Sequence, residues 1–332
     1  MRVAINGFGR IGRSILRILS EREDVEVVAL NDIAGNEGLV YLFKYDTVMG
    51  TFRGTSRLQG DVFEVNHHRV QMLAEPQVTA LPWKALGVDV VIEATGRFRK
   101  RAEIADHLQA GAHKVILTVP ARDEIDATVV LGVNDEVLKP EHEIISNASC
   151  TTNCLAPLVK VLHERFGIVQ GVMTTVHAYT NDQRLADVPH KDLRRSRAAA
   201  ENIIPTTTGA AKAVGKVLPE LAGKLDGIAM RVPVPDGSTV DLVTHMMRAI
   251  TIEEVNEAVR EAAEGPLKDI LEYCTEPVVS SDVIGNPHSS IFDSLSTMVL
   301  GGEFLKTISW YDNEWGYSCR VVDLMDRVRM FL

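Results

Sequence analysis

A glycine-rich turn near the start of the chain constrains the fold more than any other feature. A β-rich run, Val3-Ala4-Ile5, leads directly into Gly7-Phe8-Gly9-Arg10-Ile11-Gly12, and apolar residues then recur with helical spacing. A second apolar run ends at Asp32, twenty residues beyond Gly12. The order strand, glycine turn, helix, strand and acid is typical of a dinucleotide-binding βαβ unit in a parallel sheet.

Each glycine of this turn has its own expected role. Gly7 permits the tight turn, Gly9 lets the backbone approach a pyrophosphate, and Gly12 lets the helix pack close to the strand. The carboxylate of Asp32 can accept hydrogen bonds from a ribose diol and would repel a 2′-phosphate, which predicts NAD as the cofactor. A structural turn and a solvated acid are the alternatives, but they do not explain the joint spacing.

The rest of the first half continues the alternation of strands and helices. Further elements are predicted as strands at 88–92, 114–117 and 128–133 and as a helix at 101–110. This pattern predicts an α/β fold with a doubly wound parallel sheet of the Rossmann type. Thr95 and Gly96 follow one of these strands and Thr118 follows another, at the edge where cofactors bind. They are candidate cofactor contacts, and plain loop residues are an equally good interpretation.

Length and composition narrow the class of protein. A chain of 332 residues is longer than a single hydrophobic core usually accommodates, so two domains are expected. A net charge of −10 gives no electrostatic reason to expect nucleic acid as a partner, and no apolar run approaches membrane-spanning length. Four cysteines do not make a disulfide framework, and no charged and apolar leader precedes the first strand, so a cytoplasmic location is expected. The sequence contains no cluster of His and Cys residues with metal-ligand spacing, so no metal site is expected.

Cys150 is the candidate reactive residue. The apolar run 143–145 leads into the segment 146–154, and a helical apolar pattern follows, so Cys150 falls where a strand gives way to a helix. Free backbone N–H groups and the helix dipole are expected to lower the pKa of a thiol there. A buried structural cysteine is the alternative. Cys154 lies one residue too far from Cys150 for a Cys-x-x-Cys pair.

Other candidates for the chemistry lie further along the chain. A strand predicted at 171–177 ends at His177, and an imidazole can activate a cysteine from elsewhere in the sequence. Arg231 ends another predicted strand, where its planar fork suits a phosphate, with a surface ion pair as the alternative. Residues 206–209 are predicted to open a helix as a phosphate cradle, although N-capping would also explain one or two hydroxyls.

The segment 189–197 is dense in cations but has no interleaved aromatic residues. Salt bridges to a partner or small-anion binding are therefore favoured over a nucleic-acid arm.

The second half is predicted to form an α+β catalytic domain with a mostly antiparallel sheet and helices to one side. The predicted elements are strands at 225–231, 240–250 and 305–310 and helices at 252–264 and 318–330. Asn313 could reach an amide ligand, and Tyr317 could stack on the cofactor or pack at an interface. The predicted organisation is an NAD-binding domain at 1–149, a catalytic domain at 150–314, and a C-terminal helix at 315–332 that returns to the first domain.

From end to end, the chain resembles the phosphorylating glyceraldehyde-3-phosphate dehydrogenases of the bacterial type. The segments that carry the resemblance are 5–13, 44–46, 146–154, 177–184, 190–197, 202–212, 231–233 and 310–317. The segment around Cys150 and the last segment are specific to this family and its close relatives.

The resemblance implies a nucleophile, Cys150, and a base, His177. The implied NAD contacts are Arg10, Ile11, Asp32, Thr118 and Asn313. The implied contacts of the substrate phosphate and of the attacking inorganic phosphate are Ser149, Thr151, Thr180, Arg195, Thr208, Gly209 and Arg231. The implied reaction takes glyceraldehyde 3-phosphate through a thiohemiacetal and a thioester to 1,3-bisphosphoglycerate.

The resemblance also implies a homotetramer in which residues 179–201 lie against a neighbour's cofactor site. Two alternatives stay open at this point. One is an erythrose-4-phosphate dehydrogenase, a relative with the same cysteine and histidine. The other is a non-catalytic NAD-binding protein.

Overall fold

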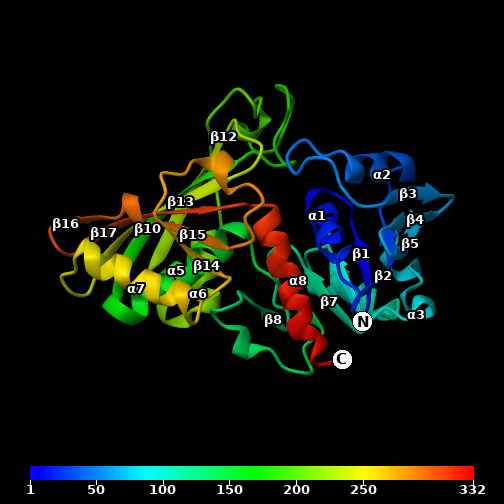
Figure 1. The fold of residues 1–332 in the computed structure, drawn as a ribbon, viewed down its shortest axis with the longest axis horizontal. Coiled ribbons are helices and arrows are strands. Elements are labelled where there is room, and N and C mark those ends of the chain that lie inside the picture. Colours follow the sequence, from blue (N-terminus) through cyan, green and yellow to red (C-terminus); the bar gives the residue numbers. More distant parts are fainter. The chain divides into compact units, whose positions relative to one another are not determined.

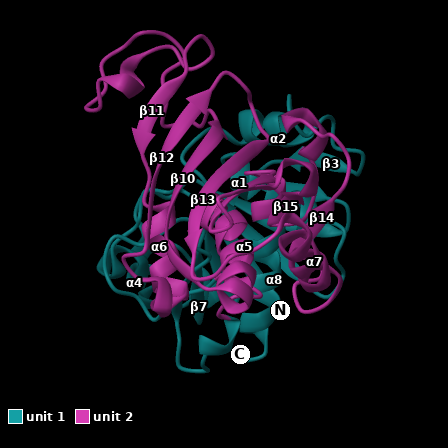
Figure 2. Cartoon of the chain, turned by 90° about the vertical axis from the view of Figure 1, so that its left-hand side faces the viewer, with its two compact units in different colours: residues 1–129, 135–149, 318–332 teal, residues 130–134, 150–317 magenta.

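The computed structural model describes residues 1–332, which divide into two compact units (Figure 2). Unit 1 comprises residues 1–129, 135–149 and 318–332, and unit 2 comprises residues 130–134 and 150–317. Each unit is built around one sheet (Figure 1).

The sheet of unit 1 has the strand order β3-β4-β5-β2-β1-β6-β7-β9-β8. Its strands from β5 to β8 pair in parallel, and only the β3–β4 and β4–β5 pairs are antiparallel. The strands are β1 (Arg2–Asn6), β2 (Glu26–Asn31), β3 (Ser56–Gln59), β4 (Val62–Val65), β5 (His68–Leu73), β6 (Val90–Glu93), β7 (Lys114–Leu117), β8 (Ala127–Thr128) and β9 (Ile144–Ser146). The predicted doubly wound parallel sheet is confirmed.

Burial explains why these short runs form central strands. All four residues of β6 and all four of β7 are buried, as expected for parallel strands that are covered on both faces. The helices of this unit are α1 (Arg10–Leu19), α2 (Asn36–Lys44), α3 (Trp83–Leu86), α4 (Arg101–Gln109) and most of α8 (Trp315–Arg329).

Several predicted elements differ from the structure, among them the strand predicted at 240–250, which ends at Met246. The strand expected at 128–133 ends at Thr128, because the chain turns at 131–133 and Gly132 takes a φ of 78°. The last helix begins at Trp315 instead of residue 318, since the Asp312 carboxylate accepts hydrogen bonds from two backbone N–H groups at its start. Thr206 and Thr207 belong to a strand, so only Thr208 and Gly209 stand at the start of the following helix.

The sheet of unit 2 has the order β11-β12-β10-β13-β17-β15-β14, with β16 paired to β17. Its strands are β10 (Ile168–Ala178), β11 (Ile204–Thr207), β12 (Leu225–Val232), β13 (Ser238–Met246), β14 (Leu271–Cys274), β15 (Ser290–Asp293), β16 (Met298–Leu300) and β17 (Phe304–Tyr311). Two pairs, β10–β12 and β14–β15, are parallel and the other five are antiparallel, which confirms the mostly antiparallel prediction.

Three helices cover one face of this sheet (Figure 1). They are α5 (Cys150–Phe166), α6 (Ala210–Val217) and α7 (Ile252–Glu264). The strands show the alternation that such one-sided cover requires, and buried residues alternate with partly exposed ones along the whole of β13. On the other face, Val172 and Ile228 remain exposed.

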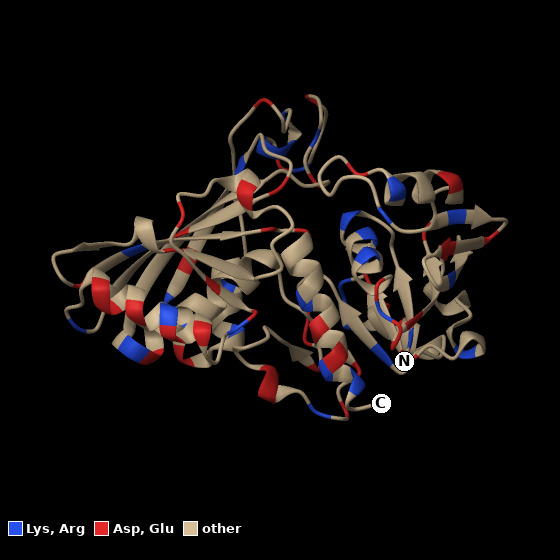
Figure 3. Ribbon diagram, in the orientation of Figure 1, with Lys and Arg blue, Asp and Glu red and all other residues tan.

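Charged residues of both signs lie together along α8 and in the loop 179–201 (Figure 3). In that loop Arg195 pairs with Asp182 and Asp192, and Arg197 pairs with Asp187. The cations of the segment 189–197 are thus partly neutralised by carboxylates of the same loop. None of the helices has the length and apolar character that crossing a membrane demands.

Candidate active site

Cys150 is the first residue of α5, where the chain leaves β9 through a three-residue turn. The backbone at Ala148 is in the left-handed region, with a φ of 55°, and its N–H donates to Ser146 Oγ at 3.1 Å. The backbone N–H and the side chain of Thr151 both hydrogen-bond the thiol. The predicted passage from strand to helix at Cys150 is confirmed.

His177 faces this thiol. It lies near the end of β10, is 3% exposed, and holds its Nε2 atom 3.5 Å from Cys150 Sγ. This is within the range in which an imidazole can exchange a proton with sulfur. The two residues are 27 positions apart in the chain, and the fold alone brings them together.

Strand register places Arg231 beside the histidine. β10 and β12 are parallel neighbours, and His177 and Arg231 are paired across them. Arg231 Nη1 lies 2.8 Å from His177 Nδ1 and donates to the Ala178 carbonyl oxygen at 3.0 Å. His177 Nδ1 is also 2.7 Å from that oxygen. With the His177 proton on Nδ1, where the Ala178 carbonyl oxygen accepts it, Arg231 donates to that oxygen and not to the ring, and the Nε2 lone pair faces the thiol.

The charges of the site differ from the expectation drawn from the helix start. Burial raises the pKa of the Cys150 thiol, and the Arg231 cation only partly opposes this. Burial, with the cation of Arg231, lowers the pKa of His177 to about 3. The expected lowering of the thiol pKa was wrong, because desolvation outweighs the helix start. At neutral pH the pair is a thiol and a neutral imidazole, so His177 can act as a base.

Cys154 is one helical turn beyond Cys150 and belongs to the core. It is 0% exposed, and its thiol hydrogen-bonds Ser290 Oγ at 3.7 Å. Burial raises its pKa strongly, so it is inert as a nucleophile.

Four of the candidate phosphate contacts form two groups. Thr180 and Arg195 both hydrogen-bond Asp182, a residue that the sequence did not single out. Arg195 also reaches toward the Thr207 carbonyl oxygen at 3.5 Å, which links this group to the end of β11.

The second group stands at the start of α6. Thr208 Oγ1 accepts from the Ala210 N–H at 3.2 Å, and Gly209 is the N-cap residue, where a side chain would meet open space.

Thr151 is held inside the site. It is 4% exposed, and its hydroxyl is 2.9 Å from that of Tyr311, which is also 2.9 Å from Thr175 Oγ1. The ring of Tyr311 meets His177 edge-on, at 5.9 Å between ring centres. Tyr311 could not be singled out from the sequence, since only the fold brings it beside Thr151 and His177. Ser149 immediately precedes Cys150 and is partly buried.

In unit 1 the glycine turn has the geometry that a dinucleotide needs. Gly7 has a φ of 97°, and a Cβ on Gly12 would clash with the Gly7 carbonyl oxygen. A Cβ on Gly9 would meet nothing within 4 Å, so the backbone there is open to a ligand. Arg10 and Ile11 form the first turn of α1, directly after this opening. The three glycines thus occupy the positions expected of a pyrophosphate-binding turn.

Asp32 follows β2 and ties the second strand to this turn. Its Oδ2 accepts from the Phe8 N–H at 2.8 Å and its Oδ1 from the Ala34 N–H at 3.0 Å. The side chain is only partly buried. Because a carboxylate has about four acceptor sites, it can still accept from a ribose diol. The residues of this edge therefore fit NAD.

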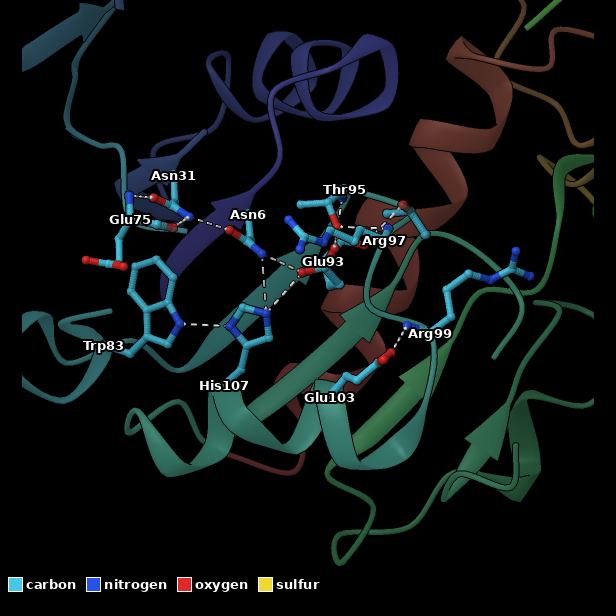
Figure 4. Close-up of polar contacts among 11 residues, drawn as sticks. Asn6, Asn31, Glu75, Trp83, Glu93, Thr95, Arg97, Arg99, Glu103 and His107 are labelled. Atoms are coloured by element: carbon cyan, nitrogen blue, oxygen red, sulfur yellow. Dashed lines mark hydrogen bonds and ion pairs between the residues drawn. The ribbon is translucent and has the colours of Figure 1, made fainter. Parts of the chain in front are cut away.

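A buried polar network supports the same edge from beneath (Figure 4). Glu93, the last residue of β6, accepts from Asn6 Nδ2 at 2.6 Å and contacts His107 Nε2 at 3.0 Å. Trp83 Nε1 donates to His107 Nδ1 at 3.0 Å, so the imidazole proton lies on Nε2 and points to Glu93. Asn31 Nδ2 in turn donates to Asn6 Oδ1 at 2.7 Å. The ends of β1, β2 and β6 are thereby locked together.

The candidate residues after β6 and β7 are held by this network. The N–H and the hydroxyl of Thr95 both donate to the Glu93 carboxylate, and Gly96 adopts a φ of 66°. Thr118 Oγ1 donates to the Glu93 carbonyl oxygen at 3.1 Å. Thr95, Gly96 and Thr118 therefore lie at one edge of the sheet, as predicted from their positions after the strands.

The last two candidates lie beyond β17. Asn313 is 6% exposed, and its Oδ1 accepts from Ser238 Oγ at 2.6 Å, which keeps its amide N–H groups as donors. Tyr317 is 4% exposed. No group of three His, Cys, Asp or Glu side chains lies close enough together to hold a metal ion.

Two family models match the chain. The model described as "Glyceraldehyde 3-phosphate dehydrogenase, NAD binding domain" matches residues 1–101, and that described as "Glyceraldehyde 3-phosphate dehydrogenase, C-terminal domain" matches residues 149–313. The chain belongs to the glyceraldehyde-3-phosphate dehydrogenase family. The resemblance inferred from the motifs is confirmed, and so is NAD as the cofactor.

Individual members of the glyceraldehyde-3-phosphate dehydrogenase family agree over nearly the whole chain. The protein is 58% identical to glyceraldehyde-3-phosphate dehydrogenase of Geobacillus stearothermophilus, over 98% of this chain and 97% of that one. It is 56% identical to glyceraldehyde-3-phosphate dehydrogenase 1 of Bacillus subtilis, with the same coverage. The enzyme of Mycobacterium leprae is 55% identical, over 99% of this chain and 98% of its own.

Proposed function

We propose that this protein catalyses the NAD-dependent, phosphorylating oxidation of glyceraldehyde 3-phosphate to 1,3-bisphosphoglycerate. The observation that carries the proposal is the approach of Cys150 Sγ to His177 Nε2, at 3.5 Å, at the start of a helix. A non-catalytic NAD-binding protein would have no use for a thiol and a base held in this relation. The relatives named above are all glyceraldehyde-3-phosphate dehydrogenases, which favours the triose phosphate over erythrose 4-phosphate.

The proposed chemistry begins with a proton transfer between the two residues. His177 Nε2 takes the thiol proton, and the thiolate attacks the aldehyde carbon to form a thiohemiacetal. His177 returns the proton to the aldehyde oxygen and then removes it again when the hydride leaves. Bound NAD supplies the hydride acceptor.

The product of this first half is a thioester on Cys150. An oxygen of inorganic phosphate attacks its carbonyl carbon, and the C–S bond breaks. The Cys150 thiolate leaves and recovers its proton from His177. Retaining the acyl group as a thioester keeps it activated, so a second anion site for the attacking phosphate is required by the reaction.

The two phosphates have separate proposed contacts. We assign the substrate phosphate mainly to Arg231, whose guanidinium can bind two oxygens at once. We assign inorganic phosphate to Thr208 and the Gly209 N–H, where backbone donors and the helix dipole meet. The remaining contacts proposed for the two anions are Ser149, Thr151, Thr180 and Arg195.

NAD is proposed to bind at the glycine turn of unit 1. Its pyrophosphate would lie on Gly9, Arg10 and Ile11, and its adenine ribose on Asp32. Asn313 would donate to the nicotinamide amide. Thr95, Gly96, Thr118 and Tyr317 complete the proposed set. We also propose that residues 1–149 with the helix 315–332 form the NAD-binding domain and that 150–314 form the catalytic domain.

Two further proposals concern the state of the protein in the cell. All four cysteines are free thiols, which supports a reducing, cytoplasmic location. Leu185 and Leu193 are 85% and 81% exposed in the segment 179–201, which supports its burial against another copy in a homotetramer. Light scattering on the purified protein would measure the number of subunits.

One assay tests the proposed function. NADH formation is followed with glyceraldehyde 3-phosphate and with erythrose 4-phosphate, each with and without inorganic phosphate. We expect sustained turnover only with the triose phosphate and phosphate together. Better turnover with erythrose 4-phosphate would favour the alternative enzyme, and no turnover with either would contradict an enzymatic role.

A further inference from the structure

Two buried carboxyl groups lie next to each other where β13 begins and β17 ends, and the chemistry above uses neither. Asp236 and Asp312 are each 1% exposed. The pairing of Ser238 with Tyr311 across these antiparallel strands brings the two segments together. Two carboxylates cannot both be ionised at such close range in a dry interior without a high cost in free energy.

Hydrogen bonds show which of the two is the anion. Asp312 Oδ1 accepts from the backbone N–H of Glu314 at 2.8 Å and from that of Trp315 at 2.6 Å. Its Oδ2 accepts from the N–H of Gly285 at 2.7 Å. Three backbone donors stabilise the charged form of a carboxylate. Asp312 is therefore the acceptor of the pair.

Asp236 has the opposite surroundings. Its Oδ1 accepts from the N–H of Gly237 at 2.8 Å, but its buried Oδ2 finds no donor. The two carboxyl groups hydrogen-bond each other. A buried carboxyl oxygen without a donor, set against an anion, is satisfied when it carries the proton itself.

We propose that Asp236 is a positioning residue that stays protonated, donates its proton to Asp312, and so holds Asn313 in place for the cofactor. Asn313 follows Asp312 directly, and its Oδ1 accepts from Ser238 Oγ, two residues beyond Asp236. Ser238 Oγ also accepts from the N–H of Ala178, the neighbour of His177. This inference rests on the assignment of Asn313 to the nicotinamide amide under the proposed function.

The hydrogen bond between Asp236 and Asp312, which we call the carboxyl clamp, is expected to break at high pH. Burial raises the pKa of Asp236 to about 9, and the neighbouring carboxylates of Asp312 and Glu314 act in the same direction. Burial also raises the pKa of Asp312. The Cys150 thiol on α5 is the other titrating group that interacts with Asp236. Below the pKa the pair shares one proton, and above it two carboxylates repel each other and the turn at 312–315 loosens.

The test is NAD affinity of the full-length protein as a function of pH, measured by titration calorimetry without substrate. In the wild type we expect affinity to fall above pH ~9 by roughly tenfold for each pH unit, since binding then requires uptake of one proton. Asp236→Asn keeps a donor toward Asp312 and cannot ionise, so its affinity should match the wild type at pH 7 and stay level to pH 10. Asp236→Leu has no donor and should bind NAD more weakly at every pH.

Two controls sharpen the result. Asp226→Asn removes an exposed carboxyl of the same unit and should keep the wild-type pH dependence. An infrared spectrum should show a protonated buried carboxyl in the wild type at pH 7, and Asp236→Asn should lack that band.

The outcomes separate this inference from the proposed function. Absence of the carboxyl band, or the same loss of affinity at high pH in Asp236→Asn as in the wild type, would overturn the clamp. If Asn313→Ala binds NAD as tightly as the wild type, the nicotinamide assignment is wrong, and with it the role of the clamp in cofactor binding. The infrared band would still show that Asp236 holds the proton.

Discussion

Cys150 Sγ lies 3.5 Å from His177 Nε2, and the other ring nitrogen of His177 lies 2.8 Å from Arg231. The histidine thus stands between a thiol and a cation. Burial keeps the Cys150 thiol protonated and the His177 imidazole neutral, so the imidazole is able to accept a proton. A substrate phosphate near Arg231 would offset the cation and make the imidazole more basic when it is needed.

Replacement of the nucleophile tests which cysteine is used. Cys150→Ser should lower turnover by about three orders of magnitude or more, because the covalent intermediate cannot form, while NAD binding survives. Cys154→Ser is the matched control and should stay active, since that thiol is buried in the core. Steady-state kinetics and NAD titration on both variants decide the question. Cys150→Ser turnover above about a tenth of wild type would exclude Cys150 as the nucleophile.

The role of His177 as a base predicts a change in thiol reactivity with pH. Burial raises the pKa of Cys150, so the thiolate forms near neutrality only when a neighbouring base takes its proton. His177→Asn should therefore slow alkylation of Cys150 by iodoacetamide near pH 7 and shift the reaction to higher pH. Alkylation rates measured across pH test this. An unchanged profile would mean that the helix start and Arg231 ionise the thiol alone.

Asp32 predicts the choice of cofactor. Its carboxylate would meet the 2′-phosphate of NADP with like charge, so the wild type should prefer NAD. Asp32→Gly should reduce the preference for NAD over NADP. It should also weaken binding of NAD, because the Asp32 carboxylate holds the N–H of Phe8 in the glycine turn. Side-by-side kinetics with the two cofactors give the ratio. Equal use of NADP by the wild type would remove Asp32 from the ribose site.

The two proposed anion sites predict separate kinetic defects. Arg231→Ala should raise KM for glyceraldehyde 3-phosphate far more than for an aldehyde without a phosphate. It should also slow both substrates, since Arg231 touches His177. Thr208→Ala should preserve the first release of NADH and slow the phosphate-dependent step. Stopped-flow traces at several phosphate concentrations separate the two. Loss of the first release in Thr208→Ala, with phosphate dependence unchanged, would show that the assignment is reversed.

Local sequence predicted the parts of the protein that local geometry decides. The roles of Gly7, Gly9 and Gly12 could be predicted from the local geometry of the turn. Gly7 and Gly12 have no room for a Cβ atom, and the backbone of Gly9 is open to a ligand. The position of Cys150 at a helix start could be predicted because an apolar strand and a helical pattern flank it.

Relations between distant segments could not be predicted in this way. Arg231 contacts His177 because β10 and β12 pair in parallel, and the spacing of residues in the sequence does not predict this pairing. The sequence shows Glu93 only as the end of a strand and His107 only as a helix residue. In the structure both are 0% exposed and hydrogen-bonded to each other. The raised pKa of Cys150 comes from the desolvation of a partly buried thiol, and this emerges only from packing.

The short strands β3, β4 and β5 were missed for a related reason. The β3–β4 and β4–β5 pairs are antiparallel, and β3 is the edge strand. Partly or fully exposed residues alternate with more buried ones in all three strands, so their apolar signal is weak.

We expect the protein to oxidise its substrate through an acyl group on Cys150 that only phosphate releases. This is tested by rapid mixing of the enzyme with NAD and glyceraldehyde 3-phosphate in the absence of phosphate. We expect a burst of NADH that does not exceed the number of Cys150 thiols, then a stall, and steady turnover once inorganic phosphate is added. Steady NADH formation without phosphate, or no burst in its absence, would contradict it.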